Sequence, residues 1–104
     1  MVGKFNYKIV WDTEAISQLK EILFYLDKKS INAARIVKYS ILEQLELLKT
    51  NPGLAQVDKL KNKSNLNFHA FVVYSYRVTY QIINDNSLIR ILRIRHTSKE
   101  PLNY

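Results

Sequence analysis

The chain has 104 residues, of which 47% are hydrophobic and 24% are charged, and this composition fits one globular domain, residues 1–104. It contains no cysteine, which excludes a disulfide framework, a thiolate nucleophile and a cysteine-bound zinc ion. No apolar run approaches the roughly 20 residues of a membrane-spanning helix, and residues 1–7 lack the apolar centre of a signal peptide. These features predict no membrane segment and are compatible with a cytoplasmic protein.

The charge is strongly positive and unevenly distributed. Sixteen lysine and arginine residues against nine aspartate and glutamate residues give a net charge of +7. Residues 1–57 contribute +2 and residues 58–104 contribute +5, and the second part also holds four of the five arginines. Arginine binds phosphate and carboxylate groups through two parallel N–H donors. This balance favours an anionic partner, which can be nucleic acid, an acidic protein segment or a membrane surface.

The first half of the chain predicts one strand and two helices. Residues 5–11 alternate between apolar and polar and predict a strand. Asp12 is a typical N-cap residue, and the helix that follows extends to about Lys28. Ser30 is expected to cap a second helix, which residues 51–53 end because they include Pro and Gly. The predicted apolar stripes are Ala15, Ile16, Leu19, Ile22, Leu23 and Leu26 in the first helix, and Ala34, Ile36, Val37, Ile41, Leu42, Leu45, Leu47 and Leu48 in the second.

The second half of the chain predicts a loop followed by three strands. Residues 54–67 are polar and rich in lysine, which is typical of a solvated loop and also fits a basic rim that faces an anion. Ser75 and residues 84–86 are turn signals, so the strands on either side of them are expected to pair as an antiparallel meander. Residues 97–104 are expected to be mostly irregular. The three strands are predicted at residues 68–73, 76–83 and 88–95.

The element order is therefore β-α-α-β-β-β, an α+β fold in which a helical hairpin covers one face of an antiparallel sheet. Alternate residues of a strand point to opposite faces. The face covered by the helices is expected to hold Val78, Tyr80, Ile82, Leu92 and Ile94. The opposite face is expected to be an open surface that holds Arg77, Thr79, Gln81, Arg93 and Arg95.

Several catalytic and binding motifs are absent from the sequence. With only Gly3 and Gly53 there is no glycine-rich phosphate loop. His69 and His96 are 27 positions apart and have no acidic partners at ligand spacing, so no metal site is predicted. No Ser-His-Asp set is recognisable, and we expect no cofactor.

Three segments resemble the RelE/ParE superfamily, the toxins of type II toxin–antitoxin (plasmid stabilization) modules. Residues 11–15 (WDTEA) resemble the strand-to-helix entry of these toxins. Residues 75–82 (SYRVTYQI) are similar to their YRV-Y-I strand. Residues 91–96 (ILRIRH), followed by Lys99–Pro101, resemble their last strand and its R-H…(D/E)-P exit. The order and spacing of the three segments extend the likeness over nearly the whole chain.

The resemblance implies a toxin that is neutralised by a small, partly disordered antitoxin with an acidic or amphipathic segment. A homodimer or a heterotetramer with the antitoxin is the expected assembly. The superfamily has two activities. One branch, RelE-like and YoeB-like, cleaves mRNA in the ribosomal A site, and the other, ParE-like, inhibits DNA gyrase and has no working nuclease site.

The resemblance also assigns candidate residues to the nuclease. Cleavage through the 2′-hydroxyl needs a base, an acid and cations near the phosphate. Arg77 and Arg95 would stabilise the phosphorane, and His96 would transfer a proton because histidine titrates near neutral pH. Asp58 stands where YoeB-like toxins have a glutamate base, and Tyr104 lies on the tail where RelE-like toxins use a tyrosine. The residues expected to bind RNA or phosphate are Lys59, Lys61, Lys63 and Arg93.

Because the arginines share one sheet face with a histidine at its end, we expect a metal-independent, ribosome-dependent mRNA endonuclease that inhibits translation. One alternative is a ParE-like gyrase inhibitor without nuclease activity, whose helical hairpin and C-terminal tail would contact gyrase. A remote alternative is a basic RNA-binding module in which aromatic residues of the strands stack on bases.

Overall fold

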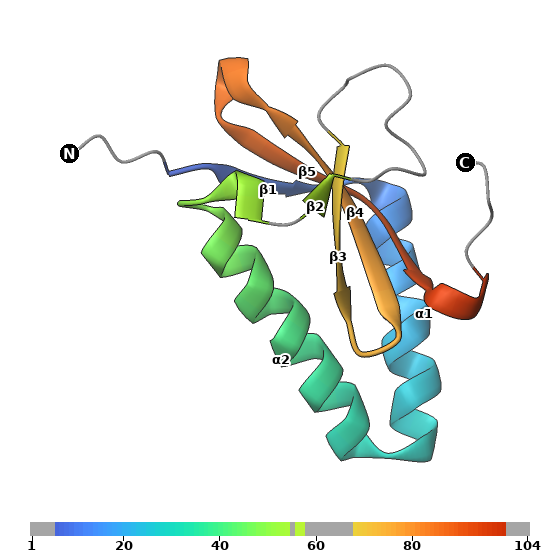
Figure 1. The fold of residues 1–104 in the computed structure, drawn as a ribbon. Coiled ribbons are helices and arrows are strands. Elements are labelled where there is room, and N and C mark those ends of the chain that lie inside the picture. The colour runs from blue at the N-terminus through green and yellow to red at the C-terminus, as the bar shows by residue number, and fades with distance from the viewer. Residues whose placement is uncertain (1–5, 55, 58–67, 100–104) are drawn as a thin grey trace.

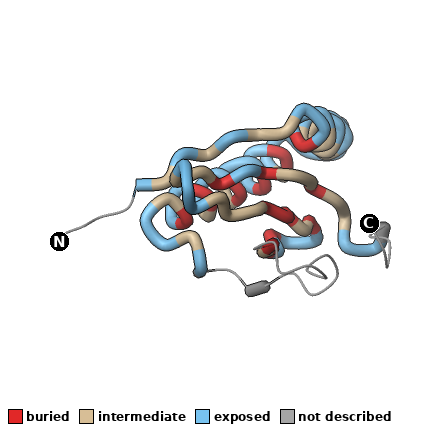
Figure 2. Tube along the Cα trace, turned by 90° about the horizontal axis from the view of Figure 1, so that it is seen from above, coloured by how far each residue is buried: buried red, intermediate tan, exposed pale blue. Residues whose placement is uncertain are grey.

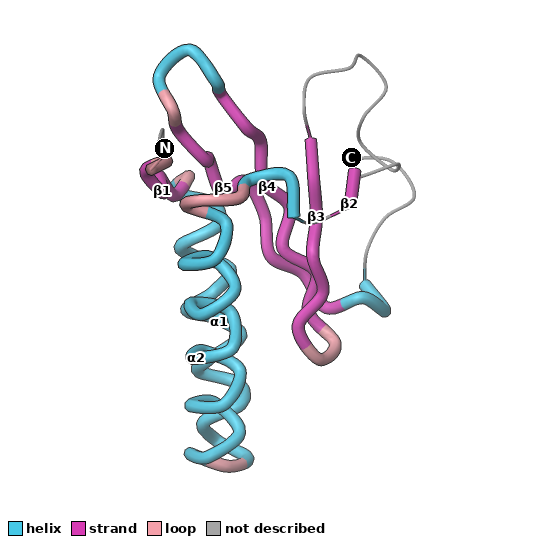
Figure 3. Tube along the Cα trace, turned by 60° about the vertical axis from the view of Figure 1, so that its left-hand side comes forward, coloured by secondary structure: helices cyan, strands magenta, loops and turns pink. Residues whose placement is uncertain are grey.

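The computed structural model describes residues 6–54, 56–57 and 68–99. Two helices lie on one side of a five-stranded sheet whose strand order is β1-β5-β4-β3-β2 (Figures 1 and 3). The predicted β-α-α-β-β-β order is confirmed, with one short strand in addition, β2. The helices and strands are β1 (Lys8–Trp11), α1 (Thr13–Lys29), α2 (Ile31–Leu48), β2 (Gln56–Val57), β3 (Phe68–Val73), β4 (Tyr76–Ile83) and β5 (Leu88–His96).

The sheet is mixed and not purely antiparallel as expected. β3, β4 and β5 form the predicted antiparallel meander. β1 runs parallel to β5, with Lys8 beside Leu88 and Trp11 beside Ile91. A parallel pair needs a long crossover connection, and here everything between β1 and β5 supplies it. β2 lies in the segment expected to be a loop and pairs antiparallel with β3.

The two helices begin in different ways. Ser30 caps α2 as predicted, because its hydroxyl oxygen accepts a hydrogen bond from the backbone N–H of Ala33 at 3.2 Å. Asp12 holds the N-cap position of α1, but its side chain makes no capping bond. Its carboxylate instead accepts a hydrogen bond from Nε of Arg90 in β5 at 2.6 Å. The Asp12 side chain therefore joins the start of α1 to the sheet. Neither helix is long and apolar enough to cross a bilayer, in the part of the chain that the structure describes.

The hydrophobic core lies between the helices and the sheet, and Figure 2 colours its buried residues red. The centre of the sheet contributes Val78, Tyr80, Ile89 and Ile91, each with no exposed surface. The Tyr80 hydroxyl donates a hydrogen bond to the carbonyl oxygen of Pro52 at 2.8 Å, so this buried phenol has a partner. The buried stripe of α2 is Ala34, Val37, Ile41, Leu45 and Leu48, as predicted.

Both helices bury a narrower stripe than the sequence predicted. Ile16 in α1 and Ile36, Leu42 and Leu47 in α2 were expected in the core but are 38–51% exposed. A helix that packs on one side only buries a limited arc of its surface, and these residues lie outside that arc. The helical layer therefore presents apolar side chains to solvent.

A bulge in β5 makes the predicted orientation of Leu92 wrong. Thr79 of β4 pairs with Arg93, but the next residue, Tyr80, pairs with Ile91, so Leu92 is an additional residue in β5. The alternation of side chains shifts by one position at this point. Ile91 consequently faces the core with no exposed surface, whereas Leu92 is half-buried and lines a small pocket with Arg93.

Candidate basic face and histidine groove

The arginines predicted to share a sheet face do lie on one face. Register pairs Arg77 of β4 with Arg95 of β5, and Thr79 with Arg93. Directly opposed residues of an antiparallel pair place their side chains on the same face. We call Arg77, Thr79, Arg93 and Arg95 the basic face.

The basic face is less open than the sequence predicted. Its three arginines are half-buried, and Thr79 is only 2% exposed. Residues of β3 stand beside them, because Ala70 pairs with Thr79 and Val72 pairs with Arg77. The Nε atom of Arg77 is itself buried. A cation that is partly withdrawn from water attracts an anion more strongly than an exposed one, because solvent and salt screen it less.

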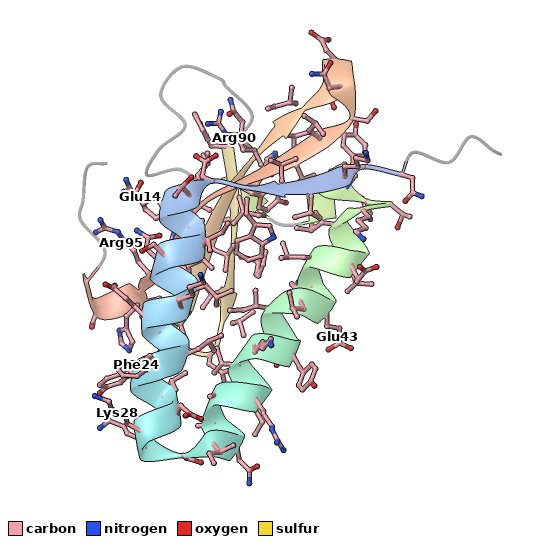
Figure 4. All side chains as sticks on the ribbon, turned by 180° about the vertical axis from the view of Figure 1, so that it is seen from behind. Glu14, Phe24, Lys28, Glu43, Arg90 and Arg95 are labelled. Carbon is pink, nitrogen blue, oxygen red and sulfur yellow. The ribbon has the colours of Figure 1, made fainter. Side chains whose placement is uncertain are left out.

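Acidic residues limit the basic face at one end. Arg90, the fourth arginine of the second half, is ion-paired with Asp12. A pocket of about 260 Å³ brings Arg90 and Arg93 near Asp12 and Glu14, and Figure 4 shows Arg90 and Glu14 at the start of α1. Asp12 and Glu14 therefore lie at the Arg93 end of the basic face.

His96 lies on the other side of the sheet from Arg77. Its register partner is Tyr76, a core residue, and the two rings meet edge to face with centroids 5.3 Å apart. Because alternate residues point to opposite faces, His96 shares the helix-facing side, whereas Arg77 is opposed to Arg95 on the other side. The structure thus opposes Arg77 to Arg95 and keeps His96 on the other side of the sheet from Arg77, although Arg95 and His96 both line one groove beside α1.

His96 is instead held in a groove between α1 and the end of β5. The backbone N–H of Ser98 donates to Nδ1 of His96 at 3.1 Å, and the Ser98 hydroxyl lies 2.8 Å from the same atom. Since Nδ1 accepts, the neutral ring carries its proton on Nε2. The groove has a volume of about 640 Å³, and its polar and aromatic residues are Gln18, Glu21, Tyr25, Tyr76, Arg95, His96 and Ser98.

Gln18 and Ser98 hold the groove together through hydrogen bonds, and neither role was predicted. Gln18 accepts a hydrogen bond from the backbone N–H of Ile94 at 2.7 Å, so α1 covers the part of β5 that extends past β1. Ser98 sets the orientation of the His96 ring. The closeness of Ser98 to His96 in the chain is a weak signal for this role, and no sequence pattern indicates Gln18.

Tyr76 gives the groove a pH-dependent contribution to stability. Burial raises the pKa of Tyr76 above its usual value of 10.0, and Tyr25 raises that pKa further. The folded chain then keeps the Tyr76 proton at a pH where the unfolded chain has lost it. The free energy of unfolding is therefore expected to fall as the pH rises through and above about 10. Tyr76→Phe should reduce this fall in urea denaturation between about pH 9 and pH 11.

Tyr74→Phe is the matched control, because Tyr74 is 66% exposed. It should leave the pH dependence unchanged. If Tyr76→Phe and Tyr74→Phe behave alike, burial of Tyr76 does not contribute to the alkaline loss of stability.

Some predicted residues cannot be placed against these features. Asp58, Lys59, Lys61, Lys63 and Tyr104 lie outside the described residues. Among the residues that are described, no three histidine, aspartate or glutamate side chains form a group that could hold a metal ion.

The fold is that of the RelE-like toxins. A free variant of the E. coli toxin RelE with two arginines replaced by alanine superposes with a TM-score of 0.64 at 13% identity, over 93% of this chain and 90% of that one. The archaeal RelE–RelB complex from Pyrococcus horikoshii OT3 gives a TM-score of 0.62 at 18% identity, over 91% and 99% of the two chains. The chromosomal ParDE system of P. aeruginosa gives 0.62 at 15% identity, over 88% and 97%. At such identities the likeness establishes the fold.

The sequence itself establishes the family. The family model described as the ParE toxin of the type II toxin–antitoxin system, parDE, matches residues 9–101. The chain therefore belongs to the ParE toxin family of the RelE/ParE superfamily, which confirms the resemblance. A search of curated proteins gives no match.

Proposed function

We propose that this chain is the toxin of a type II toxin–antitoxin module and that it acts by binding and inhibiting DNA gyrase without cutting RNA. The observation that carries this proposal is the position of His96 across the sheet from Arg77. A general acid or base must come within about 2.6–3.2 Å of the atom with which it exchanges a proton. A phosphate held by Arg77 would lie on the wrong side of the sheet for His96. The match to the ParE family supports the same branch.

The partner proposed for the basic face is an acidic or amphipathic segment of an antitoxin. The solved relatives include toxin–antitoxin complexes, such as RelBE2 of Mycobacterium tuberculosis and the intact E. coli RelBE complex. The opposed side chains of Arg77 and Arg95 offer paired donors for carboxylates. A segment that folds on binding could cover this face and exclude the toxin's target.

A ribosome-dependent endonuclease is the second candidate, and the opposed arginines favour it. Two guanidinium groups at facing positions suit the stabilisation of charge on a phosphorane. In that case the proton transfers would fall to Asp58, Tyr104 or the lysines of residues 59–63, and His96 would take no part.

The RNA-binding module has the least support. Phe71, Tyr76 and Tyr80 belong to the buried core under the helices. Aromatic side chains that stack on bases need an exposed ring face. The strand aromatics on this side of the sheet are therefore structural.

Two parallel assays of the purified chain separate the first two candidates. The first incubates it with gyrase and supercoiled plasmid and measures linear DNA after protein digestion. The second incubates it with programmed ribosomes and end-labelled mRNA. We expect toxin-dependent linear plasmid and no ribosome-dependent cuts. Cuts that appear only with ribosomes would replace the proposal with the endonuclease, and a topoisomerase I reaction on the same plasmid controls for general DNA effects.

A further inference from the structure

α2 carries a second surface on the side away from its core stripe. Ile31, Arg35, Tyr39, Leu42 and Glu46 follow one another at spacings of four, four, three and four, so they form a single stripe along the helix. All five are exposed, including Ile31 at 59% and Tyr39 at 66%. We call this set the outer stripe. It belongs to the helical layer, which Figure 4 shows from the side opposite to the sheet.

The charges of the outer stripe are placed against the field of the helix. A helix favours acidic residues near its N-terminus and basic residues near its C-terminus. α1 follows this rule, with Glu14 in its first turn and Lys28 and Lys29 in its last. α2 has no acidic residue in its first turn and no basic residue in its last, and it carries Arg35 early and Glu46 late. The field of α2 therefore does not explain this order.

A local ion pair does not explain this order of charges along α2 either. The carboxylate of Glu46 lies 2.8 Å from Nζ of Lys49, but the two side chains are 69% and 36% exposed. Exposed pairs of this kind contribute little because water and salt screen them. Arg35 makes no ion pair with any described residue.

The order of charges, basic near the start of α2 and acidic near its end, fits a second copy of α2 that runs antiparallel to the first. Arg35 and Glu46 have the same midpoint along the helix as Tyr39 and Leu42. A two-fold axis at that midpoint sets Arg35 of each copy opposite Glu46 of the other, and Tyr39 opposite Leu42. The contact then has an apolar centre between two ion pairs. We propose that the outer stripe is a homodimer interface formed by antiparallel α2 helices.

This interface lies apart from the basic face. The outer stripe is on α2, whereas Arg77 is on the sheet face that points away from the helices and Arg95 lies beside α1. A dimer formed through α2 would leave both copies of the basic face open to a partner. The inference stands whether the toxin inhibits gyrase or cleaves mRNA.

Sedimentation equilibrium of the purified chain tests the interface by charge exchange. The unchanged chain should dimerise. Arg35→Glu and Glu46→Arg should each weaken dimerisation roughly tenfold or more, because two attractive pairs become two repulsive ones. The double variant re-forms both pairs with reversed sign and should return to within about threefold of the original constant. Both single changes agree better with the helix dipole, so their melting temperatures should not fall when all chains are compared at a concentration at which they are monomeric.

Lys20→Glu is the matched control for Arg35→Glu, since it also replaces a basic side chain by an acidic one, at an exposed position of α1. It should leave dimerisation unchanged. A chain that stays monomeric at about 100 µM, or a double variant that remains as weak as the single ones, would overturn the proposal. The second result would mean that Arg35 and Glu46 do not face each other across a two-fold axis.

A disulfide provides a second measurement that does not depend on charge. The chain has no cysteine, so Leu42→Cys introduces a single thiol close to the proposed two-fold axis. On mild oxidation it should form a covalent dimer. Lys20→Cys, treated in the same way, should stay monomeric, and equal cross-linking of the two variants would contradict the interface.

Discussion

Ile91→Ala is expected to lower the free energy of unfolding by about 2–5 kcal/mol, the range for removing a large buried aliphatic side chain. Ile91 has no exposed surface and lies opposite Tyr80 in the centre of the sheet. Shortening it leaves a cavity among side chains that are fixed by the central strands and cannot collapse into the space. Urea denaturation followed by far-ultraviolet circular dichroism measures the loss.

Leu92→Ala is the matched comparison, because it removes the same kind of side chain one position along. Leu92 is the additional residue of the bulge and is half-buried outside the core, so its loss should cost no more than about 1.5 kcal/mol. A regular strand predicts the opposite ranking, with Leu92 in the core and Ile91 outside. If Leu92→Ala costs more than Ile91→Ala, the register with the bulge is wrong.

The second large effect concerns toxicity. If gyrase binds the basic face that the antitoxin would cover, Arg95→Glu should raise the concentration of toxin that inhibits gyrase by roughly 10- to 100-fold, because reversing a half-buried charge both removes an attraction and adds a repulsion. His96→Gln should change that concentration by less than about threefold, since its ring faces the groove and not the basic face. Growth arrest on expression in cells should rank the two variants in the same order.

Lys20→Glu again controls for net charge, and it should keep full potency. A His96→Gln chain that loses toxicity while Arg95→Glu keeps it would contradict the proposed role of the basic face. In that case the groove between α1 and β5 would become the surface to test next.

The repeating patterns of the sequence were sufficient for the architecture. Periods of 3.6 and 2 identified both helices and the three strands of the meander within a few residues, because a helix or strand must bury one side. Ser30 was identified as a helix cap from its residue type alone. This was sufficient because the capping hydrogen bond reaches only to Ala33, three residues away. The shared face of Arg77 and Arg95 followed from strand alternation and the turn between β4 and β5.

The features that bear on function depended on contacts between distant parts of the chain. Asp12 binds Arg90, 78 positions away, where the local pattern predicted a helix cap. The bulge at Leu92 arises from the pairing of β4 with β5. As a result Ile91 enters the core in place of Leu92. His96 follows Arg95 directly in the sequence, and this closeness led to the prediction that the histidine acts together with the arginines.

The alternation of the strand directed the side chains of Arg95 and His96 to opposite sides of the sheet, and packing of α1 beside β5 then placed His96 in the groove. Local patterns report which side of an element is apolar. They do not report which distant group arrives to pair with a polar residue or which apolar residue remains uncovered, as Tyr39 and Leu42 do on α2. Those outcomes follow from how the sheet and the two helices fit together, so the sequence defined the class of protein and the tertiary structure defined its surfaces.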